Sequence, residues 1–283
     1  MSGGLLKNLW RIVLLGALAS VLLGGSQALA TTFTLTHNGW TYYEDISQQG
    51  LGDFKDTNGV DHMWRNWWWY RTSNMQRELP LSNLVPGAGI DLIGTNEARL
   101  RFVEQGLFFE LVYKLTGISN EQAKVDIKWE IKSAGPSLGV DFFAYSDFDL
   151  NGVVASPDSG VLVDPKTVRF IKGTTAVDVI ASEAGLVGYE VGTYPNLLNK
   201  LNDIVLDNVS NSGLPYGPGD MENIFQWRGT VVSGQQTMKG TLTKLINLNY
   251  SPPPPGPVIP EPGTWALMLS GLAPVALRLR KKA

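Results

Sequence analysis

The sequence predicts an all-β fold, an antiparallel β-sandwich of jelly-roll-like type, for residues 31–250. Apolar and polar side chains alternate along residues 107–115 and 125–131, which is typical of strands with one buried and one solvated face. Residue pairs that favour turns, which contain glycine, asparagine or proline, separate these predicted strands at short intervals. Long helical patterns are scarce. Many short strands with glycine-rich turns favour a sandwich over alternating strand–helix units.

The clearest strand is residues 125–131, where Val125, Ile127 and Trp129 share a face. A short helix is expected at residues 195–201, with a proline near its start. Further strands are expected at residues 98–104, 107–115, 138–145, 167–172, 186–192, 204–209, 224–232 and 240–246.

The most unusual stretch is residues 64–71, which contains four tryptophans. If it is a strand, Trp64, Asn66, Trp68 and Tyr70 lie on one face, and Arg65, Trp67, Trp69 and Arg71 lie on the other. An exposed second face would alternate guanidinium and indole groups and could stack on sugar rings. A covered second face would be structural. Tryptophan is mostly buried, so core packing is favoured and glycan stacking is the alternative.

One stretch fits the opening of a calcium-binding loop, D-x-D-x-N-G. Its oxygen ligands would be Asp147, Asp149, Asn151 and, at the twelfth position, Asp158. Two features oppose this hypothesis, because an aspartate replaces the usual bidentate glutamate and the flanks are predicted strands rather than helices. A hairpin turn explains Asn151 and the glycine after it equally well. A turn is favoured, and calcium is the only cofactor that the sequence suggests.

Little in the composition indicates catalysis. The chain has no cysteine and two histidines, His37 and His62, which excludes thiolate nucleophiles and cysteine metal sites. Both histidines are interpreted as surface or packing residues. A glycosidase would need a pair of carboxylates, and the strand residues Glu104, Glu110 and Glu130 are the candidates. Exposed strand carboxylates are usually solvated, so we expect no enzymatic activity.

The first 30 residues have the features of a secretory signal peptide. Lys7 and Arg11 precede an apolar run at 12–23, and the segment ends in Ala-Leu-Ala at Ala30. The apolar run is shorter than the roughly 20 residues of a membrane span. We therefore expect a signal helix that uses a Sec-type export machinery and is cleaved after Ala30, with an uncleaved anchor as the alternative.

The C-terminal part consists of a linker and a tail. Residues 251–259 are rich in proline, which predicts a stiff polyproline II spacer of about 3.1 Å per residue. Residues 260–283 contain an apolar stretch, predicted to be helical, and a basic end. The positive-inside rule would keep that basic end cytoplasmic and leave the sandwich outside the membrane.

This tail resembles the PEP-CTERM sorting signal. The resemblance depends on Pro260, Glu261 and Pro262, followed by a short spacer, an apolar helix and a basic cluster. It implies recognition by an exosortase, a membrane protease-transpeptidase of Gram-negative-type bacteria that usually make extracellular polysaccharide. It also implies processing at residues 260–262 and transient membrane anchoring. An ordinary C-terminal anchor is the alternative. The tail residues concerned are Trp265, Leu267, Leu269, Leu272, Arg278, Arg280, Lys281 and Lys282.

The central domain is also similar to uncharacterised cargo proteins that bear this tail, for which no activity is established. The matching stretches are residues 61–64, 66–71, 142–149, 219–220 and 225–227. This resemblance supports the fold and implies no activity.

The charge of the central part excludes some partners. The chain has 23 basic and 26 acidic residues, of which residues 1–30 hold two basic ones and residues 260–283 hold four basic and one acidic. The remaining 17 basic and 25 acidic residues give a net charge of −8, which disfavours nucleic acid as a partner.

The sequence thus predicts an exported envelope or matrix protein, non-catalytic and associated with polysaccharide. The alternative is a carbohydrate-active hydrolase or lyase.

Overall fold

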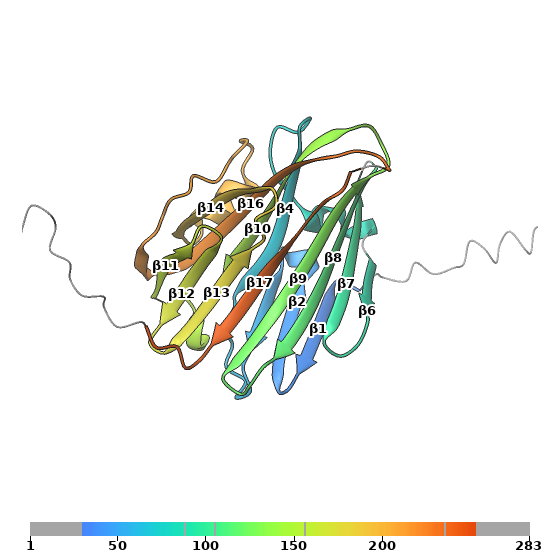
Figure 1. Cartoon of the computed structure of the whole chain (residues 1–283). Coiled ribbons are helices and arrows are strands. Elements are labelled where there is room, and N and C mark those ends of the chain that lie inside the picture. The colour runs from blue at the N-terminus through green and yellow to red at the C-terminus, as the bar shows by residue number, and fades with distance from the viewer. Residues whose placement is uncertain (1–29, 88, 105, 156, 235, 253–283) are drawn as a thin grey trace, which may run out of the picture. The chain divides into compact units, whose positions relative to one another are not determined.

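The computed structural model describes residues 30–87, 89–104, 106–155, 157–234 and 236–252. The chain divides into two compact units, Met1–Asn249 and Tyr250–Ala283, and the first contains all the described strands (Figure 1). These strands form two antiparallel sheets, which confirms the predicted all-β sandwich. Within the described ranges, no helix has the length and apolarity needed to cross a membrane.

The first sheet has eight strands. In spatial order it contains β1 (Thr32–His37), β2 (Trp40–Asp45), β3 (Leu51–Lys55), β4 (Arg65–Thr72), β10 (Leu138–Asp147), β16 (Met221–Val231) and β14 (Leu186–Thr193), and β5 (Leu79–Pro80) pairs with β4.

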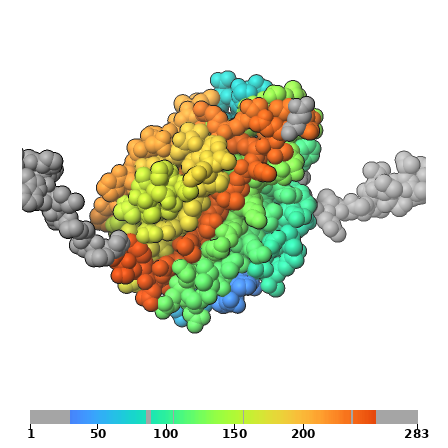
Figure 2. Space-filling model, viewed as in Figure 1, coloured from blue at the N-terminus to red at the C-terminus, as the bar shows by residue number. Residues whose placement is uncertain are grey.

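The second sheet has nine strands. In spatial order it contains β15 (Tyr216–Gly219), β11 (Asp158–Asp164), β12 (Thr167–Lys172), β13 (Thr175–Ala181), β17 (Met238–Asn247), β9 (Gln122–Ser133), β8 (Leu107–Gly117), β7 (Glu97–Glu104) and β6 (Gly89–Leu92). In Figure 2, β17 forms a continuous band across the outer face of this sheet, between β13 and β9.

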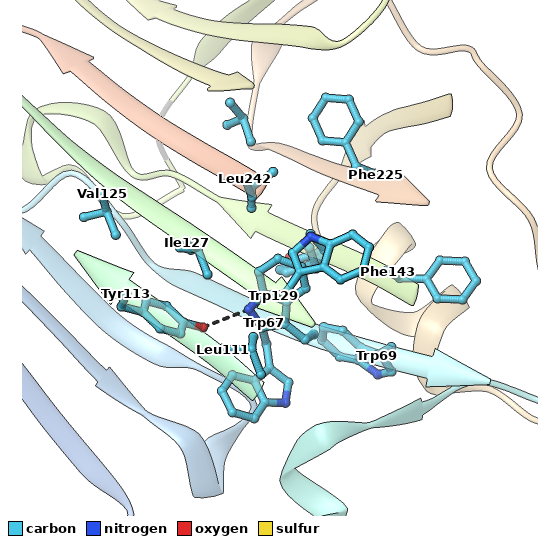
Figure 3. Packing of buried hydrophobic residues seen from close by; sticks show 14 of the residues in the cluster. Trp67, Trp69, Leu111, Tyr113, Val125, Ile127, Trp129, Phe143, Phe225 and Leu242 are labelled. Atoms are coloured by element: carbon cyan, nitrogen blue, oxygen red, sulfur yellow. Dashed lines mark hydrogen bonds between the residues drawn. The ribbon is translucent and has the colours of Figure 1, made fainter. Parts of the chain in front are cut away.

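Aromatic side chains from both sheets meet in the interior (Figure 3). The ring of Trp129 on β9 lies 5.1 Å from Phe142 on β10 and 5.4 Å from Trp227 on β16. The indole nitrogen of Trp68 on β4 donates to the hydroxyl of Tyr113 on β8 at 2.8 Å. These contacts show which side chains of each sheet face the other sheet.

Shorter elements surround the sheets. They are the 3-10 helices η1 (Ile46–Gln48), η2 (Leu81–Gly87) and η3 (Leu150–Gly152), and the α-helix α2 (Asn196–Asn202). The helix α2 contacts β5, β14 and β16 of the first sheet and buries Leu197, Leu198 and Leu201. The helix predicted at 195–201 is therefore confirmed, and its role is to cover part of the first sheet.

Most of the predicted strands are confirmed, and one prediction is wrong. Residues 204–209 form an irregular loop, in which Ile204 is 81% exposed. The loop is fixed instead by contacts near its end, where the guanidinium of Arg71 donates to the backbone carbonyl of Asp207 and, at 2.6 Å, to the side chain of Asn208. An apolar stretch in the sequence was therefore mistaken for a strand.

Candidate functional site

The second face of β4 is covered, so the proposed sugar platform is not available. Trp67 and Trp69 are each 0% exposed. Trp69 lies 5.8 Å from the ring of Tyr145 and donates to the side-chain oxygen of Asn202 in α2 at 3.2 Å. Trp67 packs against Phe102 at 6.1 Å. The glycan-stacking hypothesis for these two tryptophans is wrong, and the structural alternative is correct.

The two arginines of this face are also structural. Arg65 is half-buried and donates to the side chain of Gln49 at 3.4 Å. Arg71 is buried, forms ion pairs with Glu78 and, at 2.9 Å, with Asp141, and lies 5.4 Å from the ring centre of Phe143. The cation–π contact expected for this face therefore exists at Arg71, with a phenylalanine as its partner. Arg71 therefore holds the loop that covers the sheet in place. Its role is structural and not the binding of a ligand.

Replacing Arg71 should destabilise the fold strongly. In Arg71→Met, Glu78 and Asp141 lose a buried partner, and breaking such a pair typically costs about 3–5 kcal/mol. Urea unfolding followed by tryptophan fluorescence measures the loss. The matched control is Arg101→Met, because Arg101 pairs with Asp91 and Glu110 at the surface, where a change of about 0–1 kcal/mol is expected. Equal losses in both variants would contradict the structural role of Arg71.

The predicted calcium loop folds as a turn. Asn151 and Gly152 both have positive φ, 65° and 68°, which suits a tight turn. The side-chain oxygen of Asn151 accepts a hydrogen bond from the hydroxyl of Thr175 at 2.7 Å. Asp158 begins β11, where it pairs with Gly219 of β15. Among the described residues, no group of three or more histidine, aspartate or glutamate side chains is placed to hold a metal ion. The structure therefore favours the turn and gives the calcium hypothesis no support.

Both histidines have packing roles. The imidazole of His62 is buried and its Nδ1 accepts a hydrogen bond from the backbone of Asn151 at 3.2 Å. The Nδ1 of His37 accepts one from the backbone of Gly117 at 3.0 Å. Each histidine therefore fastens one chain segment to another.

An acidic pocket that the sequence did not predict lies at the end of β10. Asp147, Asp149 and Asp220 line a cavity of about 110 Å³, together with Trp64, Tyr194, Val154 and Ala155. Trp64 is 37% exposed, so one face of the pocket carries an accessible indole. The structure thus joins two residues of the proposed calcium loop to an aspartate about 70 positions away in the sequence. The only sequence signal for Asp220 was its place in a stretch shared with uncharacterised cargo proteins.

A second layer of polar groups lies behind this pocket. The hydroxyl of Tyr145 contacts Asp147 at 3.2 Å and Glu222 at 2.7 Å. The carboxyl of Glu222 also accepts hydrogen bonds from the backbone nitrogens of Leu197 and, at 3.4 Å, Leu198. Glu222 therefore ties the first turn of α2 to β16, and the pocket is supported by the same helix that covers Trp69.

The carboxyl groups of this region favour their protonated forms. Burial raises the pKa of Glu222 to about 7. Burial, followed by the charges of Asp220, Glu222 and Asp149, raises the pKa of Asp147 well above its usual value. Burial and the charge of Asp149 also raise the pKa of Asp220. Raised pKa values among pocket carboxyl groups are typical of sites that could hold a proton donor.

The strand glutamates considered for a glycosidase do not form an isolated pair. Glu110 and Glu130 are directly opposed on β8 and β9. Each is paired with a cation, Glu110 with Arg101 at 3.1 Å and Glu130 with Lys132 at 2.7 Å. These pairs belong to the alternating charges of the solvated face of the second sheet, so the acidic pocket is the better candidate for chemistry.

Comparison with known proteins identifies no family. No protein-family model and no curated protein sequence matches the chain. Similar solved structures include a bacterial glucoamylase complexed with acarbose, at 7% identity and a TM-score of 0.47 over 78% of this chain and 31% of that one. Another is the amine oxidase of Aspergillus nidulans, at 10% identity and a TM-score of 0.38 over 77% of this chain and 51% of that one. The chain thus spans about a third to a half of these proteins, and likenesses this weak carry no inference about function.

The stability of the fold should fall as the pH rises through the pKa of Glu222. With its folded-state pKa raised to about 7 from 4.5, Glu222 stabilises the folded state fully below pH 4.5 and loses this contribution as the pH rises through 7. Glu222→Gln keeps an acceptor oxygen for α2 and cannot ionise. The difference between the unfolding free energies at pH 5 and pH 7.5 should therefore shrink in this variant.

Urea titrations of the wild type and the variant at both pH values measure this difference. The matched control is Glu183→Gln, because Glu183 lies at the surface with 77% of its side chain exposed. An unchanged pH difference in Glu222→Gln would show that Glu222 does not titrate in this range.

Proposed function

We propose that this protein is exported across the cytoplasmic membrane and sorted by an exosortase to the bacterial cell envelope or extracellular matrix, where its sandwich serves a non-catalytic role. The observation that carries the proposal is the order of the C-terminal signals: Pro260, Glu261 and Pro262, an apolar segment and a basic end. These signals lie outside the described residues. The −8 net charge of the residues between the two end segments, 31–259, supports a soluble module carried by such signals.

Several finer features belong to the same proposal. They are the jelly-roll-like connectivity, the N-terminal signal helix that is cleaved after Ala30, the apolar C-terminal helix, and the transient membrane anchoring through that helix. The expected partners are a Sec-type export machinery and the exosortase. The proline-rich residues 251–259 would separate the sandwich from the tail during processing.

Co-expression of the full chain with an active exosortase tests the sorting route. The tail should be removed near residues 260–262, and the new N-terminus should be Thr31, both detected by mass spectrometry of the processed protein. Glu261→Ala should keep the tail, whereas Glu121→Ala, in a surface turn of the sandwich, should be processed normally. An intact tail beside an exosortase that processes a second substrate would contradict the proposal.

We further propose that the sandwich associates with extracellular polysaccharide through the acidic pocket. Trp64 offers an exposed indole beside Asp147, Asp149 and Asp220, which combines a stacking surface with hydrogen-bond acceptors for sugar hydroxyls. The buried Trp67 and Trp69 cannot serve this role. The alternative function, a carbohydrate-active hydrolase or lyase, is favoured by the raised pKa of Asp147, which would suit a general acid.

Two variants separate binding from catalysis at the pocket. Trp64→Ala should weaken binding to the polysaccharide of the producing cell about fivefold, in line with the loss of one stacking contact of about 1 kcal/mol. The matched control is Trp265→Ala in the tail, which should bind normally. If the pocket is catalytic, the wild type releases reducing ends or unsaturated products and Asp147→Asn does not. Absence of both binding and products would remove the polysaccharide hypothesis.

A further inference from the structure

A lysine lies in the middle of the apolar interior. Lys244 on β17 is 0% exposed, between the buried apolar residues Leu242 and Ile246 of the same face. Within the described residues its amine nitrogen has no hydrogen-bond partner, and it lies 4.9 Å from the ring centre of Phe148. Burying an amine without a partner is costly, so this position requires an explanation.

An amide group of the opposite sheet faces the same region. Asn66 on β4 is 0% exposed, and it lies on the same face as Trp68, which contacts Tyr113 of the second sheet. In the cross-strand register of β8, β9 and β17, Tyr113 and Leu242 fall in one row. Lys244 is therefore the next inward-facing position along β17.

A buried carboxyl group connects the amine and the amide. Glu44 on β2 accepts a hydrogen bond from the side-chain nitrogen of Asn66 at 3.1 Å and one from the hydroxyl of Tyr113 at 3.2 Å. It also interacts electrostatically with Lys244. The side-chain oxygen of Asn66 has no hydrogen-bond partner among the described residues. Glu44 thus contacts Asn66 through a hydrogen bond and Lys244 electrostatically.

The environment favours the uncharged forms of both ionisable groups. Burial lowers the pKa of Lys244 to about 7, against the opposing charges of Glu44 and Asp147. Burial raises the pKa of Glu44 to about 7, against its hydrogen bonds and the charge of Lys244. At neutral pH a large fraction of the lysine is therefore a neutral nucleophilic amine, and a large fraction of the glutamate is a carboxylic acid.

We propose that Lys244 and Asn66 form an intramolecular isopeptide bond across the two sheets, with Glu44 as the group that moves the protons. The neutral amine nitrogen of Lys244 attacks the side-chain carbonyl carbon of Asn66, so that a new C–N bond forms. Glu44 takes a proton from the attacking nitrogen and delivers one to the side-chain nitrogen of Asn66, which it already contacts. The old C–N bond breaks and ammonia leaves. One amide replaces another, and no oxidant or cofactor is needed.

This bond would fill a structural role that disulfides cannot fill here. The chain contains no cysteine, and β4 and β17 belong to different sheets. A covalent link between them closes most of the sandwich into one loop, which restricts the unfolded state and stabilises the fold. A hydrophobic interior also protects the amide from hydrolysis by excluding water.

The intact mass of the purified full chain, measured after denaturation, tests the proposal. The wild type should be lighter than its sequence mass, corrected for any terminal processing, by one ammonia molecule. A tryptic digest should contain a branched peptide that joins residues 66–71 to the peptide holding Lys244. Lys244→Met should have its full sequence mass. In the matched control Lys128→Met, on the solvated face of β9, the measured mass should still be lower than the sequence mass by one ammonia molecule.

Three outcomes would overturn the proposal. The first is a wild-type mass equal to the sequence mass. The second is an ammonia loss that persists in Lys244→Met. The third is a branched peptide that joins Lys244 to the other buried amide of this region, Asn223, instead of Asn66. If the bond forms, Glu44→Gln should leave the linkage largely unformed, because glutamine cannot carry the proton from one nitrogen to the other.

Discussion

The structure depends on the burial of β4 from both sides. One set of its side chains packs into the interior between the sheets, where Trp68 reaches Tyr113. The other set, with Trp67 and Trp69, would expose a large aromatic surface if the first sheet had a free outer face. Apolar surface of this size is strongly favoured in a water-free environment. The helix α2 supplies this cover at Trp69, and Phe102 of β7 packs against Trp67.

Covering the second face of β4 also traps polar groups. Arg71, Glu78 and Asp141 satisfy one another where the 203–209 loop crosses the sheet, and Glu222 satisfies backbone nitrogens of α2. At the end of β10, burial is the main cause that raises the pKa values of Asp147 and Asp220, and the charges of neighbouring carboxylates add to it. The acidic pocket and the structural ion pairs are therefore two results of the same constraint. They differ in the charges that lie nearby, because Arg71 pairs with Glu78 and Asp141, whereas Asp147 lies among other carboxylates.

The interior contains a second polar cluster for a different reason. Lys244, Asn66 and Glu44 lie on strands whose other inward-facing residues are apolar. Such a cluster destabilises an ordinary core, so its presence indicates a purpose other than packing. A covalent bond between the two sheets would stabilise a chain that has no cysteine and so no disulfides. It would also fix the distance between the sheets in which the aromatic rings must fit.

The sequence by itself determined the fold class and about half of the strands, because alternation along a strand fixes which side chains share a face. The delivery signals stay predictions. It predicted correctly that Trp67, Trp69, Arg65 and Arg71 lie together. Only the tertiary structure decided whether that face was covered, since Trp69 contacts a helix more than 120 positions away along the chain and Trp67 packs against Phe102 of β7. The same holds for Asp220, which joins Asp147 only because β16 pairs with β10. It also holds for Lys244, because the alternation along its strand gave no sign that it interacts with Glu44. Local periodicity describes one strand at a time, whereas burial and chemistry depend on what packs against it.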